Sequence, residues 1–158
     1  MKQVKPGWVV VISIVIAEGI GFLSGFLSGN QRNVYQDLVQ PPFAPPGWLF
    51  PVAWGILYAL MGIAAAIIYL NRGNELRRRQ GLWLYAVQLL VNFSWSIVFF
   101  RFQAFGWAVA VILLLDLLVI LTTLWFWAVS KAAGKLMIPY LLWLAYASYL
   151  AIGVYMLN

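Results

Sequence analysis

Five long apolar stretches constrain the fold of this chain more than any other feature. They lie at about residues 8–27, 48–70, 82–100, 105–129 and 136–157. Each stretch is long enough to cross roughly 30 Å of hydrocarbon as an α-helix. Because 65% of the residues are apolar and only 9% are charged, most of the surface must face lipid. We therefore predict an all-α integral membrane protein, a five-transmembrane-helix bundle that forms a single domain over residues 1–158.

The basic residues divide unequally between the two sides of such a bundle. Two lie near the N-terminus, four between Asn71 and Gln80, and two at Lys131 and Lys135, whereas the opposite side carries only Arg32 and Arg101. The positive-inside rule then places the N-terminus in the cytoplasm and the C-terminus outside the cell membrane. The net charge of +6 is accounted for by this bias, so we expect no nucleic-acid partner.

Cysteine and histidine do not occur in the sequence. Their absence excludes disulfides, thiolate or imidazole metal sites, a catalytic cysteine, a Ser-His-Asp triad and a His-ligated haem. We expect no cofactor and no metal, and any catalysis must use another kind of chemistry.

The loop over residues 28–47 differs from the other connections. It carries Pro41, Pro42, Pro45 and Pro46, which disfavour a helix and favour a semi-rigid extended segment. On the topology above, this segment forms a cover over the outer ends of the helices.

Two acids and a row of small residues lie inside the spans. Glu18 and Asp116 fall near mid-span, where an acid costs about 2.5 to 3.5 kcal/mol to insert. They either relay protons or make inward-facing polar contacts that fix helix packing. Small residues recur at four-residue steps at Ala17, Gly21, Gly25 and Gly29, a ridge that either brings another helix close or leaves room for a ligand.

Tryptophan is abundant, and its positions fall into two groups. Trp8, Trp48, Trp83 and Trp107 lie at span ends, where interfacial aromatic belts are the ordinary explanation. Deeper in the spans, Trp54, Trp95 and Trp143 share helical faces with other side chains, namely Tyr58, Asn92, Phe99 and Ala147. Aromatic walls with one or two amides under a proline-rich cover form either a pocket for a flat, mostly apolar ligand or a plain aromatic core.

These residues also resemble a known family, the tryptophan-rich sensory protein or translocator protein family (TspO/MBR). The first-loop pattern is Tyr35-x-x-Leu38-x-x-Pro41-x-Phe43-x-Pro45-Pro46-x-Trp48, followed by Pro51, Trp54, Leu57-Tyr58 and Met61-Gly62. The later motifs are Gln88-Leu89-x-x-Asn92-x-x-Trp95, Phe99-Phe100, Pro139-Tyr140-x-x-Trp143-x-x-x-Ala147-x-Tyr149-Leu150 and Leu157-Asn158. The resemblance covers essentially the whole chain, with the motifs in family order.

The resemblance implies a membrane receptor or sensor, commonly a homodimer, that binds porphyrins such as protoporphyrin IX and, in some members, cholesterol or benzodiazepine-type ligands. Matching positions imply a ligand site that consists of Tyr35, Pro45, Trp48, Trp54, Tyr58, Asn92, Trp95, Phe99, Trp143 and Ala147. Bacterial relatives are associated with light-dependent porphyrin breakdown, for which Trp54 and Trp143 are the matching catalytic positions. A transporter of porphyrin-like or sterol-like molecules is the alternative, although the odd number of spans and the lack of an internal repeat count against an inverted-repeat design.

Two positions depart from the family pattern. Val34 stands where many relatives have Trp, and Gln40 stands where relatives often have Lys, so the chemistry of the cover differs. The sterol consensus is not met at the C-terminus, because only Met156, Leu157 and Asn158 follow Tyr155. We therefore do not predict high-affinity cholesterol binding.

Overall fold

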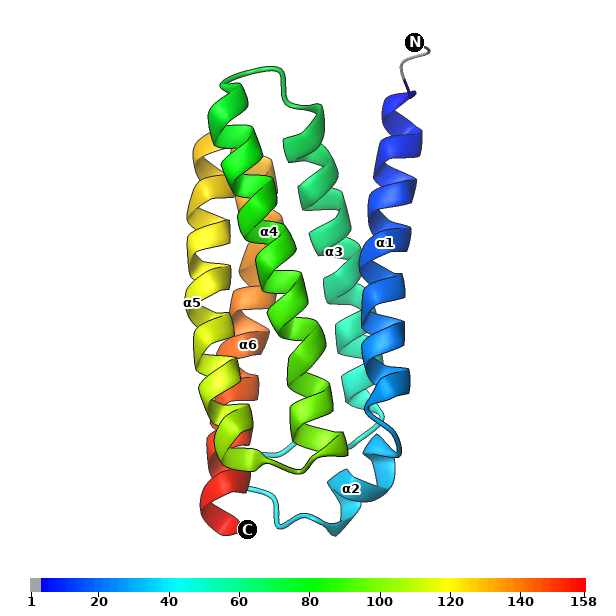
Figure 1. The fold of residues 1–158 in the computed structure, drawn as a ribbon, viewed down its shortest axis with the longest axis vertical. Helices are drawn as coiled ribbons and strands as arrows, with labels where there is room; N and C mark the ends of the chain where they lie inside the picture. Colours follow the sequence, from blue (N-terminus) through cyan, green and yellow to red (C-terminus); the bar gives the residue numbers. More distant parts are fainter. Residues whose placement is uncertain (1–3) are drawn as a thin grey trace.

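The computed structural model describes residues 4–158 and contains five long helices that run side by side (Figure 1). The helices are α1 (Pro6–Leu27), α2 (Gln31–Asp37), α3 (Leu49–Leu70), α4 (Glu75–Ser96), which continues as the π-helical turn η1 (Ile97–Arg101), α5 (Phe105–Val129) and α6 (Lys131–Leu157). Five helical segments are long and apolar enough to span a membrane: α1, α3, α4 together with η1, α5 and α6. No strand occurs in residues 4–158. The predicted all-α bundle of five membrane-spanning helices is confirmed.

Two helices begin earlier than the hydropathy pattern indicates. Helix α4 begins at Glu75 rather than at residue 82, because the side chain of Asn74 accepts a hydrogen bond from the Arg77 amide (3.0 Å) and caps the helix. Helix α6 begins at Lys131, where Ser130 caps it in the same way. Most basic residues of these segments therefore lie in the first two turns of helices, namely Arg77, Arg78, Arg79, Lys131 and Lys135, whereas Arg72 lies in the loop before α4.

The cover over residues 28–47 is only partly extended, which corrects the sequence expectation. It begins with the short helix α2, which the Asn30 side chain caps by accepting from the Asn33 amide (3.4 Å). The proline-rich part follows α2 without helix or strand apart from turns. In Figure 1, α2 and this segment lie across the end of the bundle that also holds the C-terminus, and the first turn of α1 lies at the opposite end.

Close helix contacts depend on glycine at a few places. A Cβ atom on Gly62 of α3 would lie 2.7 Å from Ile14 Cα of α1, so only glycine allows these two backbones to approach so closely. Ser24 of α1 donates to the carbonyl of Phe93 on α4 (2.8 Å). Helix α3 packs against α1 and α6, and α5 packs against α4 and α6.

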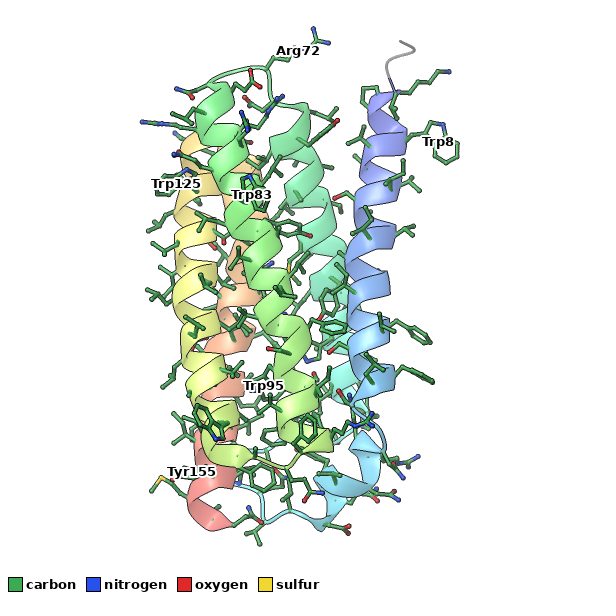
Figure 2. All side chains as sticks on the ribbon, viewed as in Figure 1. Trp8, Arg72, Trp83, Trp95, Trp125 and Tyr155 are labelled. Atoms are coloured by element: carbon green, nitrogen blue, oxygen red, sulfur yellow. The ribbon has the colours of Figure 1, made fainter. Side chains whose placement is uncertain are left out.

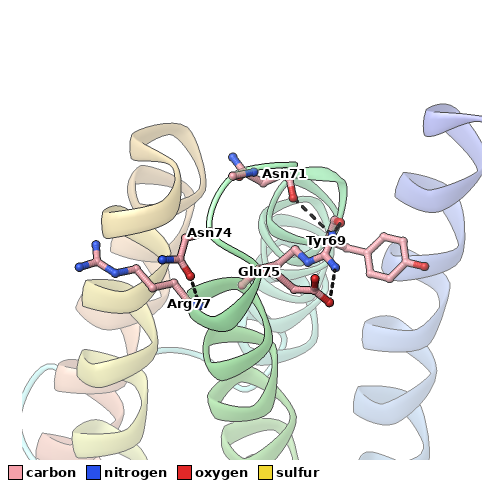
Figure 3. A network of polar contacts seen from close by, with 7 residues as sticks. Tyr69, Asn71, Asn74, Glu75 and Arg77 are labelled. Carbon is pink, nitrogen blue, oxygen red and sulfur yellow. Dashed lines mark hydrogen bonds and ion pairs between the residues drawn. The ribbon is translucent and has the colours of Figure 1, made fainter.

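The end of the bundle near the N-terminus carries several of the basic side chains, including Arg72 (Figure 2). The turn between α3 and α4 is closed by Arg78, whose Nη1 donates to the carbonyls of Tyr69 (3.3 Å) and Asn71 (3.4 Å) (Figure 3). Its Nη2 lies 3.8 Å from Glu75 Oε1. These contacts satisfy the free carbonyl groups at the end of α3.

Candidate functional site

A cavity of about 1060 Å³ lies beneath the cover, at the end of the bundle that holds the C-terminus. Its walls come from α1, α3, the end of α4 with η1, and α6, and α2 with the residues after it contributes the outer side. This volume lies slightly above the usual range for small-molecule sites, about 300 to 1,000 Å³. The sequence left a pocket and a filled aromatic core as alternatives, and this geometry favours the pocket.

One wall of the cavity is a chain of aromatic rings from α2, α3 and α6. The rings of Trp54 and Trp143 meet edge to face, with centroids 6.4 Å apart and planes at 85°. Phe50 contacts Trp143 (5.9 Å) and Tyr35 (5.1 Å), also edge to face. Such edge contacts fix ring orientations and leave the faces of other rings available to a flat ligand.

The wall formed by α4 and η1 carries a second aromatic group. The rings of Trp95 and Phe99 stack at 5.0 Å, and Trp95 Nε1 donates to the Ala108 carbonyl (3.1 Å). Because the π-helical turn carries an extra residue, the consecutive side chains Phe99 and Phe100 both reach the cavity. The indole of Trp95 is thus held at a fixed angle by a backbone contact.

Small residues leave the space that the cavity occupies. Gly21, Gly25 and Gly55 line it, together with Ala147 and Ala151. A Cβ atom on Gly21 would overlap the Tyr58 ring, whereas nothing lies within 4 Å of the Cβ position of Gly55. On α1, Gly21 therefore admits the Tyr58 ring, and Gly25 borders the cavity.

A buried chain of hydrogen bonds lies behind the aromatic wall. The Tyr58 hydroxyl donates to Asn92 Oδ1 (3.1 Å), and Asn92 Nδ2 donates to the Tyr140 hydroxyl (2.6 Å). Tyr140 in turn donates to Gln88 Oε1 (2.8 Å), and Gln88 Nε2 approaches Met61 Sδ (3.7 Å). The amide of Asn92 is therefore occupied by two tyrosines, and only Tyr58 of this chain of contacts borders the cavity.

The cover is held down at several points along α6. Asn158 Oδ1 accepts from the Val39 amide (3.0 Å), and Asn158 Nδ2 donates to the Val39 carbonyl (2.9 Å). The hydroxyls of Tyr146 and Tyr149 donate to the carbonyls of Phe43 (2.5 Å) and Pro42 (2.7 Å). Asn158 thus ties the segment after α2 to the end of α6.

Within the cover, Tyr35 connects α2 to the proline-rich segment that follows it. The Tyr35 hydroxyl donates to the buried Pro45 carbonyl (2.5 Å), and Gln40 Nε2 donates to the Tyr35 carbonyl (2.8 Å). Loss of solvent around the ring, together with the nearby Tyr146, raises the pKa of the Tyr35 hydroxyl above its ordinary value. This hydroxyl is therefore a neutral donor at physiological pH.

Two buried polar atoms at the cavity have no hydrogen-bond partner within residues 4–158. They are Trp143 Nε1, a donor, and Gln40 Oε1, an acceptor. Buried polar atoms are usually paired. A ligand that carries both an acceptor and a donor would satisfy them.

Of the ten site residues that the sequence suggests, eight line the cavity: Tyr35, Trp48, Trp54, Tyr58, Trp95, Phe99, Trp143 and Ala147. The structure places Pro45 in the cover, as an acceptor for Tyr35, and Asn92 behind the wall. Phe50 and Glu18 also line the cavity and were missed. Phe50 precedes Trp54 by one helical turn, and Glu18, Gly21 and Gly25 share one face of α1, so helical spacing is a signal that would have found both.

The two intramembrane acids have different surroundings. Asp116 on α5 accepts a hydrogen bond from Ser148 on α6 (2.6 Å). Glu18 borders the cavity and has no ion-pair or hydrogen-bond partner in the described part of the chain. No group of three acids capable of holding a metal occurs in residues 4–158.

Comparison with known proteins agrees with the residue patterns. The model of the TspO/MBR family matches residues 12–157. The tryptophan-rich protein TspO of Chlorobaculum tepidum is 40% identical over 94% of this chain and 95% of its own length. The tryptophan-rich sensory protein of Cereibacter sphaeroides is 34% identical (96% and 92% coverage), and the human translocator protein is 32% identical (90% and 86% coverage).

Proposed function

Because this chain belongs to the TspO/MBR family, a family of multi-pass membrane proteins, we propose that it is a membrane receptor or sensor for porphyrins and similar flat apolar ligands, with protoporphyrin IX as the main candidate. The observation that carries the proposal is the cavity, which has room for a large planar molecule. Its walls are aromatic, and the resemblance of the sequence to porphyrin-binding relatives supplies the ligand class.

The polar groups of the cavity also suit such a ligand. A tetrapyrrole presents an extended π surface to stack on indoles, and its carboxylates can reach Arg32 and the glutamines that line the outer side. Gln40 Oε1 and Trp143 Nε1 remain free for the polar atoms of the ligand. The apolar body of the ligand would then lie deep in the cavity between the aromatic side chains, and the carboxylates of the ligand would lie near the cover.

Titration of the purified protein with protoporphyrin IX, followed by Trp fluorescence, tests this proposal. Trp54 and Trp143 would be quenched at micromolar ligand because they border the cavity. A matched variant, Trp107→Phe, changes an indole that is 75% exposed and not part of the cavity, and it should leave the affinity unchanged. An unquenched signal at micromolar ligand would contradict the proposal.

We further propose that the bound porphyrin is degraded in light, with Trp54 and Trp143 as the reacting side chains. Dioxygen is the oxidant in this reaction: the excited porphyrin converts it to singlet oxygen, which adds to the porphyrin ring or to the indole beside it, or the porphyrin takes an electron from the indole and passes it to dioxygen. Neither route needs an acid–base dyad. The two indoles are in edge contact, so both would lie beside one ligand. Trp54→Phe and Trp143→Phe should abolish light-dependent bleaching, and equal bleaching in both variants would refute their role.

Transport is a second candidate because Glu18 borders the cavity near mid-span. A carboxyl group there could couple proton movement to movement of the ligand. Flux of protoporphyrin IX into liposomes should then fall in Glu18→Gln and Asp116→Asn, and unchanged flux would remove the reason for this candidate.

The orientation and the assembly are part of the same proposal. The excess of basic residues at the end with the N-terminus supports an N-terminus in the cytoplasm. The family resemblance supports a homodimer. Labelling of cysteines introduced singly at residues 3 and 157 in intact cells would test the first, and light scattering of the detergent-solubilised protein would test the second.

A further inference from the structure

Glu18 is a carboxyl group without a partner on the wall of the cavity. It lies about nine residues before the end of α1, which corresponds to a depth of roughly 13 Å below the outer end of the helix. Neither an ion pair nor a hydrogen bond to its side chain occurs in the part of the chain that the structure describes. An acid at this depth is costly to keep unless another group compensates it.

The side chains around Glu18 do not compensate it. On α1, the next positions along the same face are Gly21 and Gly25, which have no side chain to contribute. Tyr58 of α3, whose ring packs against Gly21 and which also lines the cavity, is a candidate donor, but its hydroxyl already donates to Asn92. The protein therefore leaves this carboxyl group to whatever occupies the cavity.

The walls beside Glu18 are aromatic. Trp54 and Tyr58 lie on α3, with ring centroids 5.6 Å apart, and Trp54 also contacts Trp143 on α6. A carboxylate that lines the same cavity as indole and phenol rings is a combination that recognises a protonated nitrogen, through a charge-assisted hydrogen bond and cation–π attraction.

We propose that the cavity binds lipophilic organic cations, with the protonated nitrogen of the ligand at Glu18 and its flat apolar body against the rings of Trp54 and Trp143. This ligand class is separate from the porphyrins, whose carboxylates are directed to the outer side. Partition into the membrane concentrates such molecules beside α1, where Phe22 and Phe26 border the cavity and are also largely exposed.

The other charged residue that borders the cavity does not oppose this arrangement. Arg32 lies in α2, beyond the outer end of α1, and so more than two helical turns from Glu18. Because Coulomb energy falls with distance, a nitrogen in contact with the carboxylate feels Glu18 far more strongly than it feels Arg32.

The test compares two probes of the same shape with the full-length protein in an uncharged detergent. 9-Aminoacridine is protonated at neutral pH, and 9-aminoanthracene has the same three rings and amino group but is neutral. Binding is followed by Trp fluorescence, with empty micelles as the blank. The wild-type protein should bind the cation about tenfold more tightly than the neutral probe, as one strong polar contact would give.

Two variants locate the charge that is responsible. Glu18→Gln should remove most of the preference for the cationic probe over the neutral probe, while the affinity for the neutral probe stays within about twofold of the wild-type value. Glu75→Gln removes an equal charge from an exposed site at the opposite end of the bundle and should keep the preference. Unchanged preference in Glu18→Gln would overturn the proposal.

Equal affinities of the two probes for the wild-type protein, or no binding of either, would overturn it as well, and this comparison needs no variant. The outcome is independent of the porphyrin proposal because protoporphyrin IX is not used. Binding of porphyrin without any preference for the cation would refute only the role of Glu18.

Discussion

Removal of a single hydroxyl, in Tyr140→Phe, should destabilise the bundle without touching the cavity. The Tyr140 side chain is completely buried and does not border the cavity. Its hydroxyl accepts from Asn92 Nδ2 (2.6 Å) and donates to Gln88 Oε1 (2.8 Å). The phenylalanine ring keeps the packing, so the change removes two hydrogen bonds and little else.

The expected magnitude follows from those two contacts. Side-chain hydrogen bonds between membrane helices contribute about 0.6 kcal/mol on average and about 1.7 kcal/mol at most. Because both Asn92 and Gln88 are left with an unpaired atom in a dry interior, we expect a loss of about 1 to 3 kcal/mol. For a chain of this size that corresponds to a fall in the melting temperature of roughly 3 to 10 °C.

Thermal unfolding in detergent, followed by intrinsic Trp fluorescence, measures this fall. Tyr69→Phe is the matched control, because the Tyr69 side chain is 57% exposed and such a change usually shifts stability by less than about 0.5 kcal/mol. Equal melting temperatures for the two variants would show that the buried network does not hold the helices together. Ligand affinity should be retained in both.

The remaining predictions concern helix approach and the cover. Gly62→Ala should lower the unfolding free energy by about 1 to 3 kcal/mol, because its Cβ atom would meet the backbone of α1. Gly19→Ala, with nothing within 4 Å of its Cβ position, should leave the melting temperature unchanged or raise it, and an equal loss in both variants would contradict the reasoning. Asn158→Ala should loosen the cover by about 1 kcal/mol, seen as faster hydrogen exchange at the Val39 amide, and unchanged exchange there would show that other contacts close the cavity.

The spans could be predicted from the sequence because membrane insertion depends on length and hydropathy, which are local properties. Helix α2 could not, since its seven residues carry no apolar periodicity and depend on one cap at Asn30. The early start of α4 was hidden by its arginines, which lower the hydropathy of a segment that the Asn74 cap nevertheless makes helical. Both errors occur where a single side-chain contact, and not composition, determines the backbone.

The sequence left open whether the aromatic side chains surround a cavity or fill the core, because residue types alone do not distinguish these two arrangements. The outcome depends on distances between helices. Trp54 and Trp143 were correctly grouped, since each lies deep in its span, but Asn92 was grouped with them only by helical spacing. Its two tyrosine partners come from α3 and α6, and no pattern within one helix reveals such a pairing.

The same tertiary contacts explain why the cavity stays open. Large side chains can rotate and fill a cavity unless other contacts fix their positions. In this protein, hydrogen bonds on the side away from the cavity fix two of the rings. Tyr58 is bonded to Asn92, and Trp95 to the backbone of α5. On the other side, glycine on α1 provides nothing that could fill the gap, and the cover is fixed to α6 by the terminal Asn158. A rigid polar network on one side and missing side chains on the other therefore keep the cavity open, so the ligand that we propose would need little conformational ordering to bind.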